Sequence, residues 1–294
     1  MSGNIPRKPT GDLDVRVGDD HWLSGVDRVP TPHQTGHHDS LDSIVIHYTA
    51  GSSAPSSVRE LTDPERKASV HLVVGRYETV TQIVAFDCVA WHAGKSAHHG
   101  LTGLNKHSIG IEIDNAGKLE KSGAAYLAWI GRRYEEDEVF AGVHRNQAQL
   151  AHWHRYTEEQ LEIVYEVCSA LIARYPTIEF ILGHEEISPK RKIDPGPAFP
   201  LDKMRDRLLN GDRDQDEAEG DDILDITQEG GRLGRVFDTD RLNLRSSPIV
   251  NGRNKLGRLR QGTQVRILED ESGWYKVKAD VEGWGSKRYI EQDG

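Results

Sequence analysis

The sequence predicts an α/β domain, a mixed sheet flanked by helices, followed by a small all-β domain. Three observations support this prediction. Short β-branched runs alternate with an amphipathic helix over residues 43–182. A strongly acidic stretch occupies residues 211–229. Short alternating segments separated by glycine fill residues 230–294.

The strands of the first domain are predicted from their apolar patterns. Residues 43–49 form a β-branched run typical of a buried strand. Residues 70–74 and 79–84 read as two strands joined by a short turn. Residues 108–113 alternate, which places Glu112 on the face opposite its two isoleucine neighbours.

One helix is predicted with clear boundaries. Thr157 and Gln160 form a capping box, apolar residues then repeat at helical spacing, and Pro176 ends the helix. A further strand is expected over residues 178–182. Residues 118–156 contain two tryptophans and three histidines but match no regular pattern, so we expect an excursion over the domain surface.

Charge divides the chain. Residues 211–229 contain nine acids and one base, too polar a segment to fold, and read as a linker. We therefore predict a large first domain with an N-terminal extension over residues 1–210 and a second domain over 230–294. The second domain is only modestly basic, so a nucleic-acid partner is not expected.

Other features limit the class of protein. No apolar run approaches the roughly 20 residues of a transmembrane helix, so membrane insertion is not expected. The first residues do not match the pattern of a Sec-type signal peptide, so none is expected. Cys88 and Cys168 are too few for a disulfide framework; we expect reduced thiols, with a single disulfide still open.

The fourteen histidines all lie at or before residue 184, so a histidine-based site would belong to the first domain. His47 and His184 each follow a predicted strand, and Asp194 lies in a loop stiffened by a Pro-Gly-Pro run. Two imidazoles and a carboxylate would suit a catalytic zinc ion. Taken singly, each histidine is more often structural, and an aspartate before proline is usually a turn residue.

Five segments that follow one another along the chain favour a metal site over the structural interpretation of the single residues. Together they closely resemble the zinc-dependent N-acetylmuramoyl-L-alanine amidases of the type-2 family, whose fold is shared by peptidoglycan recognition proteins. The resemblance runs from about residue 28 to about residue 208. The segments are His47-Tyr48-Thr49-Ala50, Ala90-Trp91-His92-Ala93-Gly94, Asn105 followed by Ser108-Ile109-Gly110-Ile111-Glu112, Gly183-His184-Glu185-Glu186-Ile187, and Lys192-Ile193-Asp194-Pro195-Gly196-Pro197-Ala198-Phe199.

The resemblance implies a set of roles. His47, His184 and Asp194 would bind Zn²⁺, with a fourth position for water. Glu112 would act as general acid/base, and Lys192 would stabilise the developing oxyanion. Without the resemblance, Glu112 reads as a surface acid and Lys192 as a solvated lysine.

Further residues are candidates for substrate binding. Trp91 and His92 suit a sugar-binding groove, since aromatic faces pack on sugar rings. Tyr48 either contacts substrate or simply packs. His71 either supports the site or belongs to the core. Asn105 is included because it is part of the third segment of the resemblance.

The second domain resembles a bacterial SH3 domain over about residues 235–292, beginning with Leu242-Asn243-Leu244-Arg245-Ser246-Ser247-Pro248. The resemblance implies a module that binds cell-wall peptide. Its aromatic residues fit a barrel core and a ligand platform equally well; they are Trp274, Tyr275, Trp284 and Tyr289.

The sequence thus predicts an endolysin-like peptidoglycan hydrolase. It would cleave the amide between the lactyl group of N-acetylmuramic acid and L-alanine by zinc-activated water. The alternatives are a catalytically silent peptidoglycan-binding protein and a zinc peptidase acting on the stem peptide. We expect synthesis in the cytoplasm, and action on the wall or periplasm after lysis-type release or specialised export, or in cytosolic recycling. Oligomeric state is not predicted.

Overall fold

A computed structural model describes ten stretches of the chain, within two compact units that are described separately below. In the described residues, no helix is both long and apolar enough to cross a bilayer. The stretches are 15–77, 79–123, 125–209, 232–237, 241–248, 255–260, 262–271, 274–279, 282–286 and 290–292. The predicted acidic linker lies outside them.

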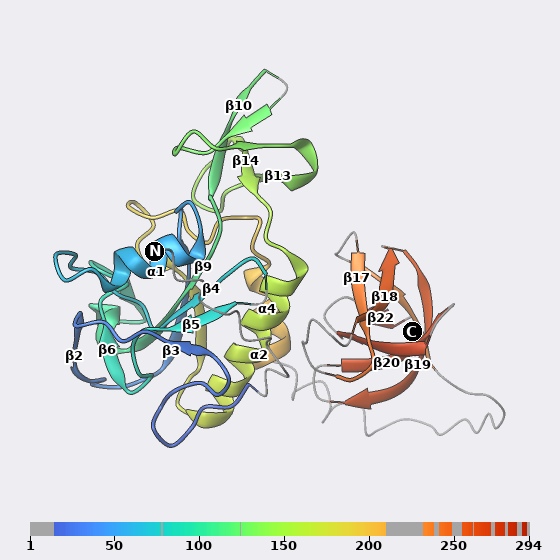
Figure 1. Ribbon diagram of the computed structural model, residues 1–294, viewed down its shortest axis with the longest axis horizontal. Helices are drawn as coiled ribbons and strands as arrows, with labels where there is room; N and C mark the ends of the chain where they lie inside the picture. Colours follow the sequence, from blue (N-terminus) through green and yellow to red (C-terminus); the bar gives the residue numbers. More distant parts are fainter. Residues whose placement is uncertain are drawn as a thin grey trace, which may run out of the picture. The chain divides into compact units, whose positions relative to one another are not determined.

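The first unit is built on a six-stranded mixed sheet, as predicted (Figure 1). Four neighbouring strands, β4, β9, β3 and β15, run parallel, and β5 joins β4 antiparallel. In sheet order the strands are β1 (Asp27–Arg28), β5 (Val80–Gln82), β4 (Leu72–Val74), β9 (Ser108–Ile113), β3 (Ser43–Tyr48) and β15 (Phe180–Gly183).

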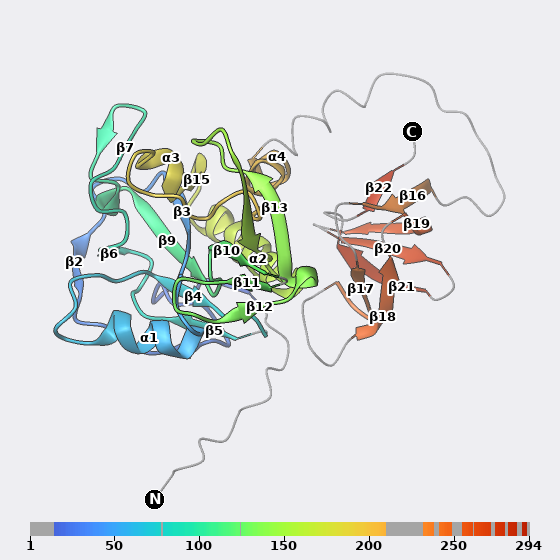
Figure 2. The same ribbon diagram turned by 90° about the horizontal axis from the view of Figure 1, so that it is seen from above.

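Helices cover both faces of this sheet (Figure 2). The first, α1 (Ala54–Thr62), packs on the face that carries Val73. On the other side, α2 (Glu158–Arg174) and α4 (Leu201–Leu209) contact one another and the sheet. Both views show strands between α1 and the other two helices.

The predicted helix and strands are confirmed, with shorter strands than expected at β4 and β5. Helix α2 begins with the expected capping box, in which Thr157 Oγ1 accepts from Gln160 N at 3.1 Å. It ends at Arg174, before Pro176. Both cysteines are free, and Cys168 is buried in α2.

The stretch without a predicted element forms a five-stranded antiparallel sheet that projects from the first unit (Figure 1). Its core includes Leu119, Tyr126, Tyr134 and Val139. In order, its strands are β12 (Arg133–Tyr134), β11 (Ala125–Leu127), β10 (Lys118–Ser122), β14 (Leu150–His154) and β13 (Val139–Val143). We call residues 118–156 the insert sheet.

Several short elements complete the first unit. Two strand pairs lie beside the central sheet, and short helices interrupt the loops. They are β2 (Gln34–His37) with β6 (Cys88–Ala90), β7 (Ala97–His98) with β8 (Leu101–Thr102), η1 (Leu104–Lys106), η2 (Glu136–Glu138) and α3 (His184–Ile187).

The second unit contains a seven-stranded sheet of small strands. Trp274 and Tyr275 are buried, and Tyr275 belongs to the core of this unit. The Trp284 side chain and Tyr289 lie outside the described part. The sheet order is β18 (Lys255–Arg260), β17 (Arg241–Arg245), β21 (Glu282–Ser286), β20 (Trp274–Lys278), β19 (Gln264–Glu271), β16 (Arg232–Val236) and β22 (Ile290–Gln292).

Candidate active site

Three parallel strands end side by side and bring distant residues together. His47 on β3 pairs in register with Glu112 on β9, and Gly183 on β15 pairs with Ile46. Because paired residues of neighbouring parallel strands face the same side, His47 and Glu112 both point to the face that α1 covers. His184 follows Gly183 directly and therefore lies beside His47.

Three side-chain atoms converge at this edge. His47 Nδ1 lies 2.9 Å from His184 Nδ1 and 3.0 Å from Asp194 Oδ2, and His184 Nδ1 lies 2.9 Å from the same oxygen. All three residues are buried. Ligand atoms of four-coordinate zinc lie roughly 3.3 Å apart, since each bond is about 2.0–2.2 Å long. The observed triangle needs only a small expansion to hold such an ion.

The second nitrogen of each imidazole is already engaged. His184 Nε2 lies 3.2 Å from the carbonyl oxygen of Ala93, and His47 Nε2 lies 3.0 Å from His92 Nδ1. His92 Nε2 in turn lies 3.3 Å from the Ser108 carbonyl oxygen. One tautomer set gives every ring N–H an acceptor: His184, His47 and His92 each donate from Nε2. The two Nδ1 atoms then present lone pairs to each other and to a carboxylate, an arrangement that a cation would stabilise.

Electrostatics favour the ligating protonation states. Burial lowers the pKa of His47 to about 4, and the neighbouring His184 acts in the same direction. Burial alone would raise the pKa of Asp194, but hydrogen bonds to His184 and His47 outweigh it and hold that pKa well below its ordinary value. At neutral pH the site therefore offers a neutral His47 and an ionised Asp194, as a metal requires.

Glu112 has the properties of an acid/base group. Burial raises the pKa of its carboxyl to about 8; Asp194 raises it further, and Lys192 opposes the shift. Its Oε2 atom is buried and has no hydrogen-bond partner among the described residues. The residue as a whole keeps partial exposure, and a carboxyl group with a pKa raised to about 8 is suited to exchanging protons with a substrate.

Glu112 and Lys192 line one groove of about 450 Å³. Helix α1 and the loop after it also contribute to its lining, as does Thr49, two residues beyond His47. The groove carries the cationic side chains of Arg66, Lys67 and Lys192 and the acidic side chains of Glu60 and Glu112.

The residues predicted to bind substrate differ in how far they are exposed. His71 is fully buried; its Nε2 lies 2.9 Å from the Cys88 carbonyl oxygen, and its Nδ1 accepts from Gly110 N at 2.9 Å. His71 therefore belongs to the core, and the prediction of substrate contact is wrong for it. Tyr48 and Trp91 keep partial exposure.

Two further candidates hold the site together. Asn105 Oδ1 accepts from the backbone N–H groups of His92 and Ala93, at 3.0 and 2.7 Å. This amide fixes the loop whose carbonyl engages His184. His92, through its contact with His47, positions a donor atom of the cluster.

The insert sheet supplies supports that sequence analysis missed. His144 Nε2 lies 2.6 Å from Glu185 Oε2, and both side chains are buried. Glu185 also pairs with Arg145 and accepts from Gly196 N at 3.1 Å. Glu185 N also donates to the Asp194 carbonyl. The cluster therefore connects the segment that carries His184 with the loop that carries Asp194.

Glycine is required where the insert sheet meets the Asp194 loop. Gly196 has φ +72°, and a Cβ there would lie 2.9 Å from the Trp153 ring. Tyr156 adds a hydrogen bond of 2.8 Å to the Pro195 carbonyl. Neither contact has a recognisable signal in the sequence, because each joins segments about 40 residues apart.

Comparison with known proteins assigns the first unit. Residues 37–197 match the family model for N-acetylmuramoyl-L-alanine amidase. The chain belongs to this amidase family. Residues 240–291 match the bacterial SH3 domain model, which identifies the second unit. Both resemblances inferred from sequence are confirmed.

Individual relatives match over about half to two thirds of this chain. N-acetylmuramoyl-L-alanine amidase AmiD of Escherichia coli is 33% identical over 169 residues, covering 55% of this chain but only 51% of that protein. The 1,6-anhydro-N-acetylmuramyl-L-alanine amidase AmpD of Citrobacter freundii is 28% identical over 207 residues, or 64% of this chain and 92% of that protein. The solved complex of E. coli AmiD with anhydro-N-acetylmuramic acid-L-Ala-D-gamma-Glu-L-Lys has a TM-score of 0.43 and 30% identity, covering 65% of each chain.

Proposed function

We propose that this chain hydrolyses the amide between the lactyl group of N-acetylmuramic acid and L-alanine in peptidoglycan. The convergence of His47, His184 and Asp194 beside Glu112 carries the proposal. Family membership supports the reaction class, and the relative solved with a muramyl peptide supports the substrate class.

The donor set supports zinc as the metal. Two imidazole nitrogens and one carboxylate oxygen form a three-ligand set of the kind found in zinc hydrolases. When bound there, zinc supplies Lewis acidity that lowers the pKa of water and polarises a carbonyl group.

The remaining chemistry is assigned to the chain's own side chains. Glu112, which lines the groove, accepts a proton from the attacking water and returns it to the departing L-alanine nitrogen. Lys192, which lines the same groove, places positive charge near the oxygen that becomes negative. His92 and Asn105 keep the histidine donors oriented.

The groove suits a peptide that carries carboxylates. Arg66 and Lys67, in the loop after α1, line the same groove as Lys192. Arg66 is partly neutralised by Glu60 at 3.2 Å. We assign the stem peptide, with its acidic groups, to this part of the groove.

The SH3 domain is proposed to bind the wall. Holding the enzyme on a polymer raises the local substrate concentration without any change in the active site. We therefore favour polymeric peptidoglycan as substrate, reached after lysis-type release or specialised export, over small fragments recycled in the cytosol.

Product analysis tests the proposal. Purified sacculi treated with the full chain and zinc should gain amino termini on L-alanine without new reducing sugar ends. His184→Ala should abolish this release while leaving the fold intact by circular dichroism. Cleavage inside the stem peptide would instead establish the peptidase alternative, and binding without any product would establish the silent binder.

A further inference from the structure

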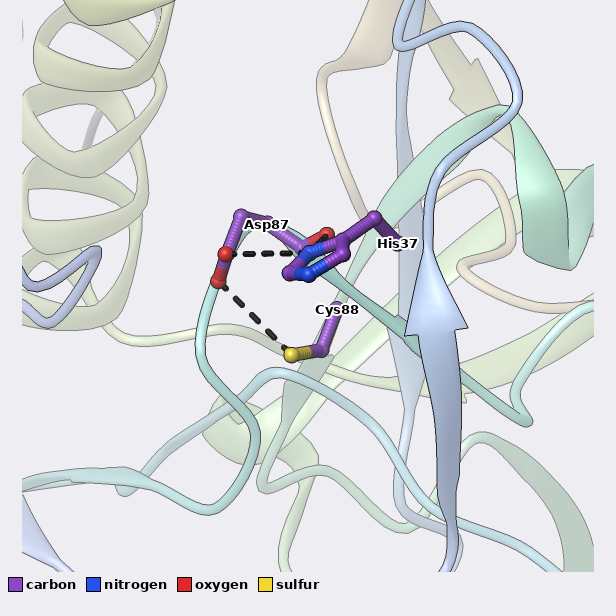
Figure 3. A group of neighbouring side chains, drawn as sticks. All are labelled: His37, Asp87 and Cys88. Atoms are coloured by element: carbon purple, nitrogen blue, oxygen red, sulfur yellow. Dashed lines mark hydrogen bonds and ion pairs between the residues drawn. The ribbon is translucent and has the colours of Figure 1, made fainter.

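A second cluster of metal-binding side chains lies outside the active site. His37, Asp87 and Cys88 each offer one ligand atom, and these atoms all lie within 4.8 Å of one another (Figure 3). His37 Nδ1 is 3.2 Å from Asp87 Oδ2, and Cys88 Sγ is 3.7 Å from Asp87 Oδ1. None of the three belongs to the catalytic cluster, and none contributes to the proposed reaction.

The backbone explains why these side chains meet. His37 on β2 pairs directly with Cys88 on β6, and directly opposed residues of antiparallel strands project from the same face. The register shifts between Thr35 and His37, and the unpaired residue, Gly36, has φ +40°. Such a bulge re-aims the following side chain, here toward Asp87.

Backbone hydrogen bonds hold this arrangement at both strands. The Asp87 carbonyl accepts from His38 N at 3.4 Å, and Cys88 N donates to the Ala85 carbonyl at 3.1 Å. On the inner side, the Cys88 carbonyl is engaged by the buried ring of His71. The thiol is thus carried on backbone that is anchored to the domain core.

The donor set selects one class of cation. Sulfur and imidazole nitrogen favour borderline-soft ions such as Zn²⁺, whereas Ca²⁺ and Mg²⁺ take oxygen ligands. In a tetrahedral zinc site with Zn–S of about 2.3 Å, ligand atoms lie roughly 3.3–3.7 Å apart. His37 and Cys88 approach different oxygens of Asp87, and with one ligand atom from each residue the three atoms lie within 4.8 Å of one another, so a small side-chain adjustment would bring them to these separations. The His37 side chain is 76% exposed and that of Asp87 28%, so an ion can enter and water can complete the coordination.

We propose that His37, Asp87 and Cys88 form a second, solvent-accessible site for a divalent cation of the zinc class. Binding replaces the thiol proton of Cys88, which passes to solvent, and moves the N–H of His37 to Nε2 on the exposed side of the ring. The ion clips β2 to β6 and stabilises the amidase domain by mass action. This site does not depend on the proposed reaction.

Cobalt(II) provides a probe that separates the two sites. A thiolate bound to cobalt gives an intense near-ultraviolet charge-transfer band, whereas imidazole and carboxylate ligands do not. The catalytic cluster contains no sulfur, and Cys168 is buried within α2. Titration of metal-free full-length protein should therefore show two cobalt ions per chain, with the band saturating at one ion.

Variants assign each ion. Cys88→Ser should lose the band and one equivalent of cobalt, and the matched control Cys168→Ser should keep both. His184→Ala should lose the other equivalent, together with activity, and keep the band. Because the His37 side chain is 76% exposed, we expect His37→Ala to leave the core intact, and it should weaken the band-forming affinity at least tenfold.

The opposite results would overturn the site. A single cobalt ion per wild-type chain, a band that survives Cys88→Ser, or unchanged band-forming affinity in His37→Ala would each show that the cluster is an ordinary surface ion pair beside a thiol. If no sample, the wild type included, shows amidase activity, the proposed function is refuted. The conclusion about the second metal site still stands, because the cobalt–thiolate band does not require turnover.

Discussion

Replacing Glu112 with glutamine should stabilise the metal-free protein at high pH while removing its activity. Burial raises the pKa of this carboxyl from 4.5 to about 8 in the folded protein. Between those values the folded chain keeps a proton that the unfolded chain has lost, so the wild-type free energy of unfolding falls as pH rises through this window. Glutamine mimics the protonated side chain and avoids that loss.

The size of the effect follows from the shift. A pKa moved from 4.5 to about 8 corresponds to about 5 kcal/mol once the group is ionised in both states. Glu112 retains partial solvent access, and Lys192 offsets part of the cost. We therefore expect Glu112→Gln to gain about 2 kcal/mol at pH 9 and nothing at pH 4.

Urea unfolding in the presence of a chelator, at pH 4, 7 and 9, measures this difference directly. With zinc added, the gain at pH 9 should shrink, because the cation also stabilises the wild-type carboxylate. Turnover by the variant should fall by about 10²–10⁴-fold with zinc affinity largely retained. A variant that is destabilised equally at every pH would refute the raised pKa of the Glu112 carboxyl.

Two further substitutions test the supports of the site. His92→Phe keeps an aromatic ring, one atom larger, but removes the partner of His47 Nε2, so metal affinity measured by chelator competition should fall about 10–100-fold; unchanged affinity would show that this contact does not orient His47. His144→Ala leaves Glu185 buried with only Arg145 and Gly196 N, and should cost about 3 kcal/mol in chemical denaturation. A cost below about 1 kcal/mol would mean that water or Arg145 replaces the lost partner.

Features of the site that depend on neighbouring residues in the sequence were predicted correctly. Alternation along β9 placed Glu112 on the face opposite Ile111 and Ile113, and the structure leaves Glu112 partly exposed between those buried neighbours. The capping box and proline set the ends of α2. What the sequence could not predict is register: the pairing of β3 with β9 and with β15 joins residues far apart in the chain, and no local pattern encodes it.

The insert sheet escaped prediction for a different reason. Its strands are short and largely polar; β10, for example, buries only Leu119 among five residues. Its stability comes from aromatic rings such as Tyr126 and Tyr134 that meet across strands. A cross-strand aromatic pair leaves no periodic signal in a single strand, so the segment that braces the Asp194 loop had no pattern to detect.

Buried histidines show most clearly where sequence reasoning stops and geometry takes over. An imidazole has two nitrogens, and the role of a histidine follows from the partner that each nitrogen contacts. In His71 both are engaged inside the fold, and in His144 one faces Glu185 while the other accepts from Asn146 N. In His47 and His184 one nitrogen is engaged by a support and the other converges on Asp194. A ligand is therefore distinguished from a supporting histidine by a free nitrogen that meets other donors, a property that arises only when three strands align.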